Sequence, residues 1–191
     1  IAWGYFSGCL TATSTTFTGN ASIMGKVYFP RLVMPITTVL SQLISFVIQF
    51  AMFLCFWIYY CIVGAVTPNW MIALLPLFVL QMACLGLGFG VIISALTTKY
   101  RDLVQLMSFG VQLWMYATPV AYDIAIIPQS IMPIYMLNPI TPVINGMRYA
   151  FLGVGEFQWL YYLIGWAITI FVLFIGVLLF NKVEKTFMDT V

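Results

Sequence analysis

Charged residues are scarce in this chain, and their scarcity decides its class. Seven Lys and Arg and five Asp and Glu occur among 191 residues, so 6% of the chain is charged and 63% is hydrophobic. A soluble globular domain carries about 25% charged residues. So few charges cannot cover a water-facing surface, and lipid must therefore be the main solvent of this protein.

Histidine is absent, and the four cysteines, at positions 9, 55, 61 and 84, form no CxxC pair or other metal-binding spacing. Buried apolar thiols are the simplest role for them. Without imidazole no nucleophile–base–orienter set can be assembled, and the acidic residues lie too far apart along the chain for a paired-carboxylate hydrolase. The scattered basic residues form no stripe for nucleic acid. We therefore expect no enzyme activity, no metal and no cofactor in this chain.

The few charges and turn signals divide the chain into apolar segments of membrane-spanning length. A helix needs about 20 apolar residues to cross the hydrocarbon core. No charge occurs from Leu32 to Thr98, and the turn signal Thr67-Pro68-Asn69 divides this stretch into two helices. We expect an all-α integral membrane protein with about five spanning helices, at residues 1–18, 35–62, 70–97, 103–122 and 157–180.

Prolines interrupt the apolar segment 124–152, at Pro128, Pro133, Pro139 and Pro142. Proline frees backbone groups that lipid cannot satisfy, so a broken segment is tolerated only where it is buried in protein or lines a cavity. The pattern predicts a re-entrant or interfacial helical hairpin. It does not distinguish a gate from a simple plug.

The basic residues alternate between the two sides that these spans define. Six of the seven lie in the first, third and fifth water-facing segments: Lys26, Arg31, Lys99, Arg101, Lys182 and Lys185. Only Arg148 lies in the fourth segment. The positive-inside rule then places the C-terminus in the cytoplasm and the hairpin at 124–152 on the outer face.

The two central spans contain no ionisable side chain apart from cysteine and tyrosine. Secondary transporters driven by protons or cations usually need an ionisable or ion-coordinating site near the midplane. The absence favours an energy source outside this chain, although a sodium site built from carbonyls and hydroxyls stays open. Gly86 and Gly90 in one of these spans, like Gly4 and Gly8 earlier, have the spacing of close helix packing and lack the context of a phosphate loop.

The segment 20–31 carries Lys26, Tyr28, Phe29 and Arg31. Aromatic side chains beside arginine are typical of protein–protein anchors, which favours a cytoplasmic coupling helix that docks onto a soluble motor subunit. The same residues also suit a loop anchored at the membrane interface. Both interpretations remain open on the residues alone.

Aromatic and polar side chains near the outer segment are candidates for a translocation pathway. Aromatic rings stack on sugars, and Trp114, Tyr116 and Tyr122 lead into this segment, where Asn138 and Arg148 add polar groups. The hydroxyls from Ser7 to Thr18 are further candidates. The competing roles are lipid-facing bulk for the rings and hydrogen bonds to the preceding helical turn for the hydroxyls.

Short distinctive runs are spread over nearly the whole chain. They are Lys26-Val-Tyr-Phe-Pro-Arg31 with Met34-Pro35, Lys99-Tyr-Arg-Asp-Leu103, Val111-Gln-Leu-Trp-Met-Tyr-Ala-Thr-Pro-Val-Ala-Tyr122, Leu137-Asn-Pro-Ile-Thr141, Gly146-Met-Arg-Tyr149 and Val183-Glu-Lys-Thr-Phe187. In this order they resemble the permease subunits of type-2 ABC exporters. The resemblance is to the polysaccharide and polyol-phosphate branch, which exports O-antigen, capsule or teichoic-acid polymers.

The resemblance implies a six-span permease that forms a homodimeric pore in the bacterial inner membrane. This chain would hold spans two to six and lack the amino-terminal part. Segment 20–31 would be the coupling helix and 124–152 the paired outer gate helices. ATP and Mg²⁺ would bind to two copies of a separate ATPase subunit, which would drive a lipid-linked polymer out of the cytoplasm. The alternative within the same fold is a permease for a small hydrophobic drug or lipid.

Overall fold

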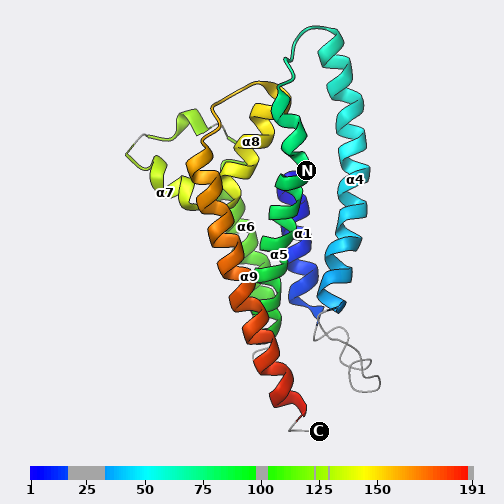
Figure 1. Ribbon diagram of the computed structural model, residues 1–191, viewed down its shortest axis with the longest axis vertical. Coiled ribbons are helices and arrows are strands. Elements are labelled where there is room, and N and C mark those ends of the chain that lie inside the picture. The colour runs from blue at the N-terminus through cyan, green and yellow to red at the C-terminus, as the bar shows by residue number, and fades with distance from the viewer. Residues whose placement is uncertain (17–32, 98–102, 123, 129, 189–191) are drawn as a thin grey trace.

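The computed structural model describes residues 1–16, 33–97, 103–122, 124–128 and 130–188 (Figure 1). Throughout these residues the regular secondary structure is helical and includes no strand, which confirms the all-α class. The elements are α1 (Ala2–Ser14), α4 (Val33–Ile62), η1 (Trp70–Leu74), α5 (Leu75–Thr97), α6 (Leu103–Ala117), η2 (Ile124–Ile126), α7 (Met132–Leu137), α8 (Ile140–Leu152) and α9 (Trp159–Met188).

Helices lie in each range that was predicted to span the membrane, but they differ in length. Three are long and apolar enough to cross a bilayer, at Val33–Ile62, Trp70–Thr97 and Trp159–Asn181. The described parts of α1 and α6 have 13 and 15 residues, fewer than the roughly 20 that a perpendicular span requires. The helix expected to reach Tyr122 ends at Ala117 because Pro119 follows closely and disfavours helical geometry at the residue before it.

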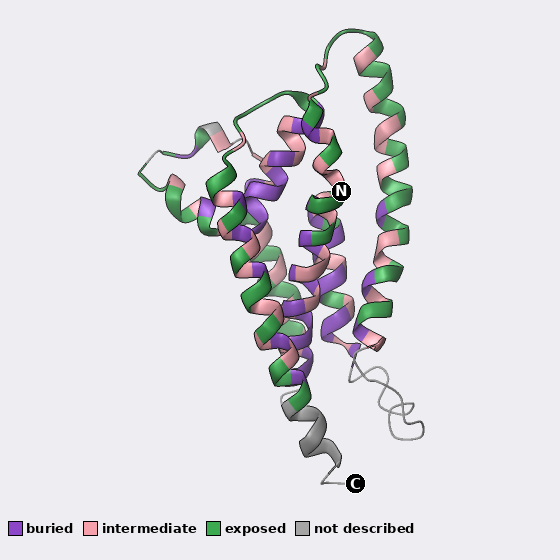
Figure 2. Ribbon diagram, in the orientation of Figure 1, coloured by how far each residue is buried: buried purple, intermediate pink, exposed green. Residues whose placement is uncertain are grey.

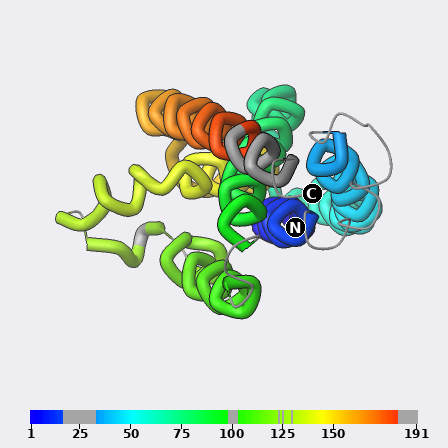
Figure 3. The backbone as a smooth tube through the Cα atoms, turned by 90° about the horizontal axis from the view of Figure 1, so that it is seen from below, coloured from blue at the N-terminus to red at the C-terminus, as the bar shows by residue number. Residues whose placement is uncertain are grey.

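The central helix of the bundle is α5, which lies between α1 and α9 (Figures 1 and 3). Its glycines allow this arrangement. A Cβ atom on Gly86 would lie 2.7 Å from the Cβ of Cys9 in α1, and one on Gly90 would lie 2.5 Å from the Cβ of Thr13. On the opposite face, a Cβ on Gly176 of α9 would lie 2.9 Å from the carbonyl oxygen of Gly88. The close packing predicted from Gly86 and Gly90 is therefore present against α1, and the contact between Gly88 and Gly176 adds a second close approach, against α9.

Helices α4 and α6, at the periphery of the bundle, leave most of their apolar side chains at least partly exposed (Figure 2). In the 30 residues of α4 only Pro35, Val39 and Phe46 are buried, and α6 has no buried residue. Exposed rings and aliphatic chains of this extent suit a lipid environment and agree with the shortage of charge.

The proline-broken segment folds into two helices, α7 and α8, at the end of the bundle opposite the C-terminal end of α9 (Figure 1). Pro133 lies in the first turn of α7, and Pro139 is the N-cap residue of α8. Pro142 lies in the first turn of α8. At such positions the absent N–H costs nothing, because the first N–H groups of a helix have no partner within the helix.

Candidate functional site

Five predicted pathway residues come together around the C-terminal end of α6. Trp114 and Tyr116 lie on α6, Tyr122 follows it, Asn138 joins α7 to α8, and Arg148 lies on α8. Side-chain hydrogen bonds connect them in two groups: Trp114 with Asn138, and Arg148 with Tyr122 and onward to Tyr116. The structure thus brings these five residues together, and their role in a translocation pathway stays a prediction.

Asn138 is the most connected side chain of the region. Its Oδ1 accepts hydrogen bonds from Trp114 Nε1 and from the backbone N–H of Ile140, both at 3.3 Å. Its Nδ2 donates to Thr118 Oγ1 at 2.9 Å, and Thr118 in turn donates to the Trp114 carbonyl at 2.8 Å. An amide that accepts from the backbone two residues ahead stabilises a turn, so Asn138 holds the turn that leads into α8 and also connects it to α6.

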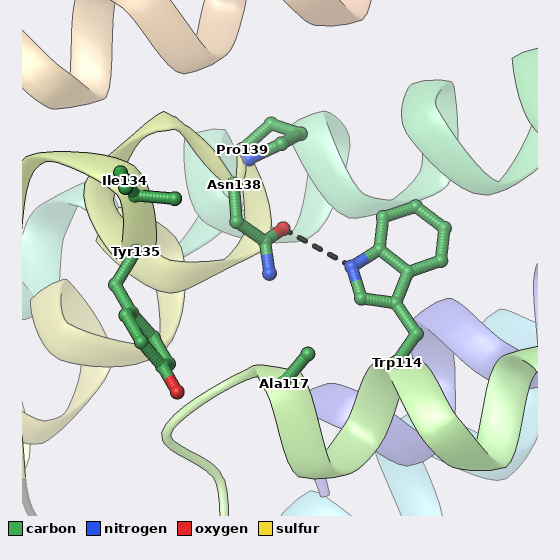
Figure 4. Close-up of a pocket in the computed structure, with 6 residues that line it drawn as sticks. All are labelled: Trp114, Ala117, Ile134, Tyr135, Asn138 and Pro139. Atoms are coloured by element: carbon green, nitrogen blue, oxygen red, sulfur yellow. Dashed lines mark hydrogen bonds between the residues drawn. The ribbon is translucent and has the colours of Figure 1, made fainter. Parts of the chain in front are cut away.

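A pocket opens beside this amide, with a volume of about 360 Å³. Its six lining residues come from α6, α7 and the turn before α8: Trp114, Ala117, Ile134, Tyr135, Asn138 and Pro139 (Figure 4). Figure 4 shows the Trp114 indole and the Asn138 amide facing each other across it. The lining combines aromatic rings, aliphatic groups and one amide.

The ring of Trp114 faces the protein core as well as the pocket. It makes edge-on contacts with Phe6 at 5.3 Å, Phe89 at 5.1 Å and Trp3 at 6.4 Å between ring centroids. Such contacts stabilise a packed aromatic cluster. Tyr116, by contrast, is 62% exposed. Of these two rings, Tyr116 has the surface to contact a molecule outside the fold, and Trp114 holds α6 against α1 and α5.

Arg148 uses its guanidinium to hold the chain that follows α6. Nη2 donates to the Val120 carbonyl at 2.8 Å and Nη1 donates to the Tyr122 carbonyl at 3.0 Å. The Tyr122 hydroxyl donates back to the Tyr116 carbonyl at 3.1 Å. Hydrogen bonds from a charged donor are stronger than neutral ones, and the planar fork of arginine suits two acceptors at once.

Thr118 was missed at the sequence level. It is fully buried and bridges the Trp114 carbonyl and the Asn138 amide. A threonine just after a span resembles any other residue of an interface, so no local signal marks it.

The hydroxyls of the first helix mostly bond their own backbone, which was the competing account. Ser7 donates to the Gly4 carbonyl and Ser14 to the Thr11 carbonyl, at 3.2 and 2.8 Å. Two bonds run between helices here: Thr97 Oγ1 of α5 donates to the Ser14 carbonyl at 3.3 Å, and the hydroxyl oxygens of Thr13 and of Thr38 in α4 lie 3.5 Å apart. These groups therefore support helix α1 and its packing on α5.

The predicted coupling residues Lys26, Tyr28, Phe29 and Arg31 lie outside the residues that the structure describes. Within the described part of the chain, no group of three His, Cys, Asp or Glu side chains is placed to hold a metal ion. The polar groups that the hydrogen bonds above bring together around the C-terminal end of α6 are amides, hydroxyls, carbonyls and the Arg148 guanidinium, which are suited to binding and positioning.

Residues 1–152 match the protein family described as ABC-2 type transporter. The chain belongs to this family. An ABC-2 chain is the membrane component of an ABC transporter, so this protein is a multi-pass permease, and its family implies an ATP-binding partner. The match confirms the resemblance to type-2 ABC permeases, and it includes α1 to α8 with the whole outer region.

Three relatives of this ABC-2 permease, each longer than this chain, share a common name. An O-antigen export system permease protein RfbA of Klebsiella pneumoniae is 28% identical over 190 residues, which are 98% of this chain and 71% of the relative. A second Klebsiella pneumoniae protein of that name is 28% identical over 187 residues. The RfbA permease of Myxococcus xanthus is 27% identical over 153 residues, 79% of this chain and 57% of the relative.

Proposed function

We propose that this ABC-2 permease forms the membrane channel through which an ATP-driven exporter moves a lipid-linked polysaccharide out of the cytoplasm. The observation that carries the proposal is the similarity over 98% of the chain to permeases named for O-antigen export. The order of the distinctive sequence runs from Lys26 to Phe187 supports the same branch.

We infer that the energy for transport comes from ATP hydrolysis in a separate subunit. The sequence has no nucleotide-binding motif and its central spans have no acidic or basic side chain, which favours this source. Two copies of an ATPase subunit bind ATP and Mg²⁺ on the cytoplasmic side. Two copies of the permease enclose the channel, and segment 20–31 is the coupling helix that receives the ATPase.

We infer that the C-terminus lies in the cytoplasm of a bacterium and that the α7–α8 hairpin lies at the outer face of its inner membrane. The distribution of basic residues supports this orientation. The position of the hairpin at the opposite end of the bundle from the last turns of α9 also supports it (Figure 1).

The outer region serves as the exit of the channel. Tyr116 is the exposed ring that contacts the passing polymer, and Tyr122 lies beside it. Trp114, Asn138 and Arg148 position the hairpin against α6. Amide and aromatic groups around an open pocket suit a glycan, whose rings stack and whose hydroxyls accept and donate hydrogen bonds.

The test is co-purification followed by transport with the full-length protein from its native membrane. We expect an ATPase subunit of nearly equal stoichiometry, and we expect lipid-linked glycan to accelerate ATP hydrolysis by the complex. Phe29→Ala and Arg31→Ala should lower glycan export while the permease remains in the membrane. A permease that purifies without any ATPase would contradict the proposal, and acceleration by hydrophobic drugs but not by glycan would favour the drug permease.

A further inference from the structure

Carbonyl groups in the last turn of α8 accept hydrogen bonds from a distant part of the chain. The final carbonyls of a helix have no partner within the helix, and at membrane depth a carbonyl without a donor is costly. Gly153 N donates to the Tyr149 carbonyl at 3.1 Å, as an ordinary C-cap does. The next two carbonyls receive donors from α4 and the loop after it: Asn69 N bonds Ala150 at 3.1 Å, and Trp57 Nε1 bonds Phe151 at 2.7 Å.

The ring of Phe151 strengthens the same junction. Its centroid lies 5.5 to 5.6 Å from the rings of Phe50, Phe53 and Trp57 of α4, and each contact is edge-on. Positions 50, 53 and 57 fall on one face of a helix, so α4 presents a continuous aromatic strip to Phe151. Phe151 is 3% exposed, although most of α4 is exposed (Figure 2). The outer half of α4 is therefore attached to α8 through these side chains.

The same end of α8 also contacts the segment that follows α6. Arg148 lies three residues before Phe151, within the same last part of α8, and holds the Val120 and Tyr122 carbonyls. Residues three apart lie on neighbouring positions of a helix surface. One helical turn of α8 is thus bound to α4 through Phe151 and to the segment after α6 through Arg148.

From these contacts we propose that Trp57 is a positioning residue for transport, which makes α4 a lever that moves the outer hairpin. The proposal rests on the proposed function, in which segment 20–31 is driven by the ATPase. Helix α4 begins at Val33, directly after that segment, and its 30 residues extend about 45 Å at 1.5 Å per residue. A displacement at its inner end therefore arrives at Trp57, passes to α8 through Phe151 and reaches the exit beside Tyr122 through Arg148.

The first test compares Trp57→Phe with wild type in the reconstituted full-length permease–ATPase complex. Phenylalanine keeps an aromatic ring in the strip but cannot donate to the Phe151 carbonyl. We expect normal assembly and ATP hydrolysis, with polymer exported per ATP reduced roughly fivefold, the order of effect of one ordinary hydrogen bond. Trp70→Phe is the matched control, because Trp70 is also at the outer end but is 71% exposed, and it should export normally.

A second measurement follows the distance between α4 and α8, first with Trp57 intact. Spin labels replace Ile62 at the end of α4 and Leu152 at the end of α8, which are 80% and 41% exposed, in a variant without native cysteines. If α4 and α8 move as one unit, the distance between the labels stays constant through the ATP cycle. The same labels should show a broadened or shifted distance when Trp57→Phe is added.

The outcomes separate this inference from the proposed function. Wild-type protein that lacks an ATPase or exports no polymer contradicts the proposed function and removes the lever with it. If the Trp57→Phe complex exports polymer at the wild-type level, the inference about α4 is wrong and the proposed function is unaffected. A label distance that changes with nucleotide in the wild-type complex also overturns it, because the junction would then not transmit movement rigidly.

Discussion

The indole Nε1 of Trp114 donates a hydrogen bond to the Oδ1 of Asn138 at 3.3 Å, across 24 residues of sequence. The bond joins the outer end of α6 to the start of α8. Because Asn138 also accepts from the Ile140 N–H and donates to Thr118, one amide serves three partners. The attachment of the outer hairpin therefore depends strongly on this single side chain.

Asn138→Ala should destabilise the protein by about 1–3 kcal/mol, because Trp114 and the start of α8 lose their acceptor in a partly buried place. Thermal unfolding of the detergent-solubilised protein measures this loss. Asn145→Ala, a half-buried amide on α8, is the control and should change the unfolding temperature less. Equal shifts in the two variants would show that the Asn138 network contributes nothing specific.

Gly86→Ala should destabilise the packing of α1 on α5. The added Cβ would lie 2.7 Å from the Cβ of Cys9 and 3.2 Å from the Phe6 carbonyl oxygen, so the helices must separate. Overpacking of this kind costs about 1–3 kcal/mol. Gly110→Ala on α6 meets nothing within 4 Å and should be neutral or slightly stabilising, since alanine favours helix. Unfolding temperatures that fall equally would argue against close α1–α5 packing.

Gln81→Leu should leave stability unchanged or raise it. Gln81 is fully buried in α5, and neither atom of its amide has a hydrogen-bond partner among the residues that the structure describes. Replacing an unsatisfied buried polar group by an apolar one of similar shape removes a desolvation cost. Gln105→Leu, on the exposed side of α6, is the control for added hydrophobicity. A clear fall in unfolding temperature for Gln81→Leu alone would mean that the amide is bonded in the membrane.

The location of the helices could be predicted because each signal is local. The prolines from Pro128 to Pro142 predicted a broken helical segment, and α7 and α8 occupy it. The end of α6 was placed five residues too late, at Tyr122, because the apolar run continues past Ala117 and hides the effect of Pro119. The spacing of Gly86 and Gly90 predicted close packing but could not say that the partner is α1.

The sequence by itself determined the class of this protein, its helical content and its family. The composition shows that lipid surrounds the protein, and the length of an uncharged run determines which segments can cross the bilayer. Both properties can be read along the chain. Only the tertiary structure decided which polar groups meet. Trp57 and Arg148 both bind backbone carbonyls, and a carbonyl is the same in every residue, so no pattern of side chains identifies Phe151, Val120 or Tyr122 as the acceptor.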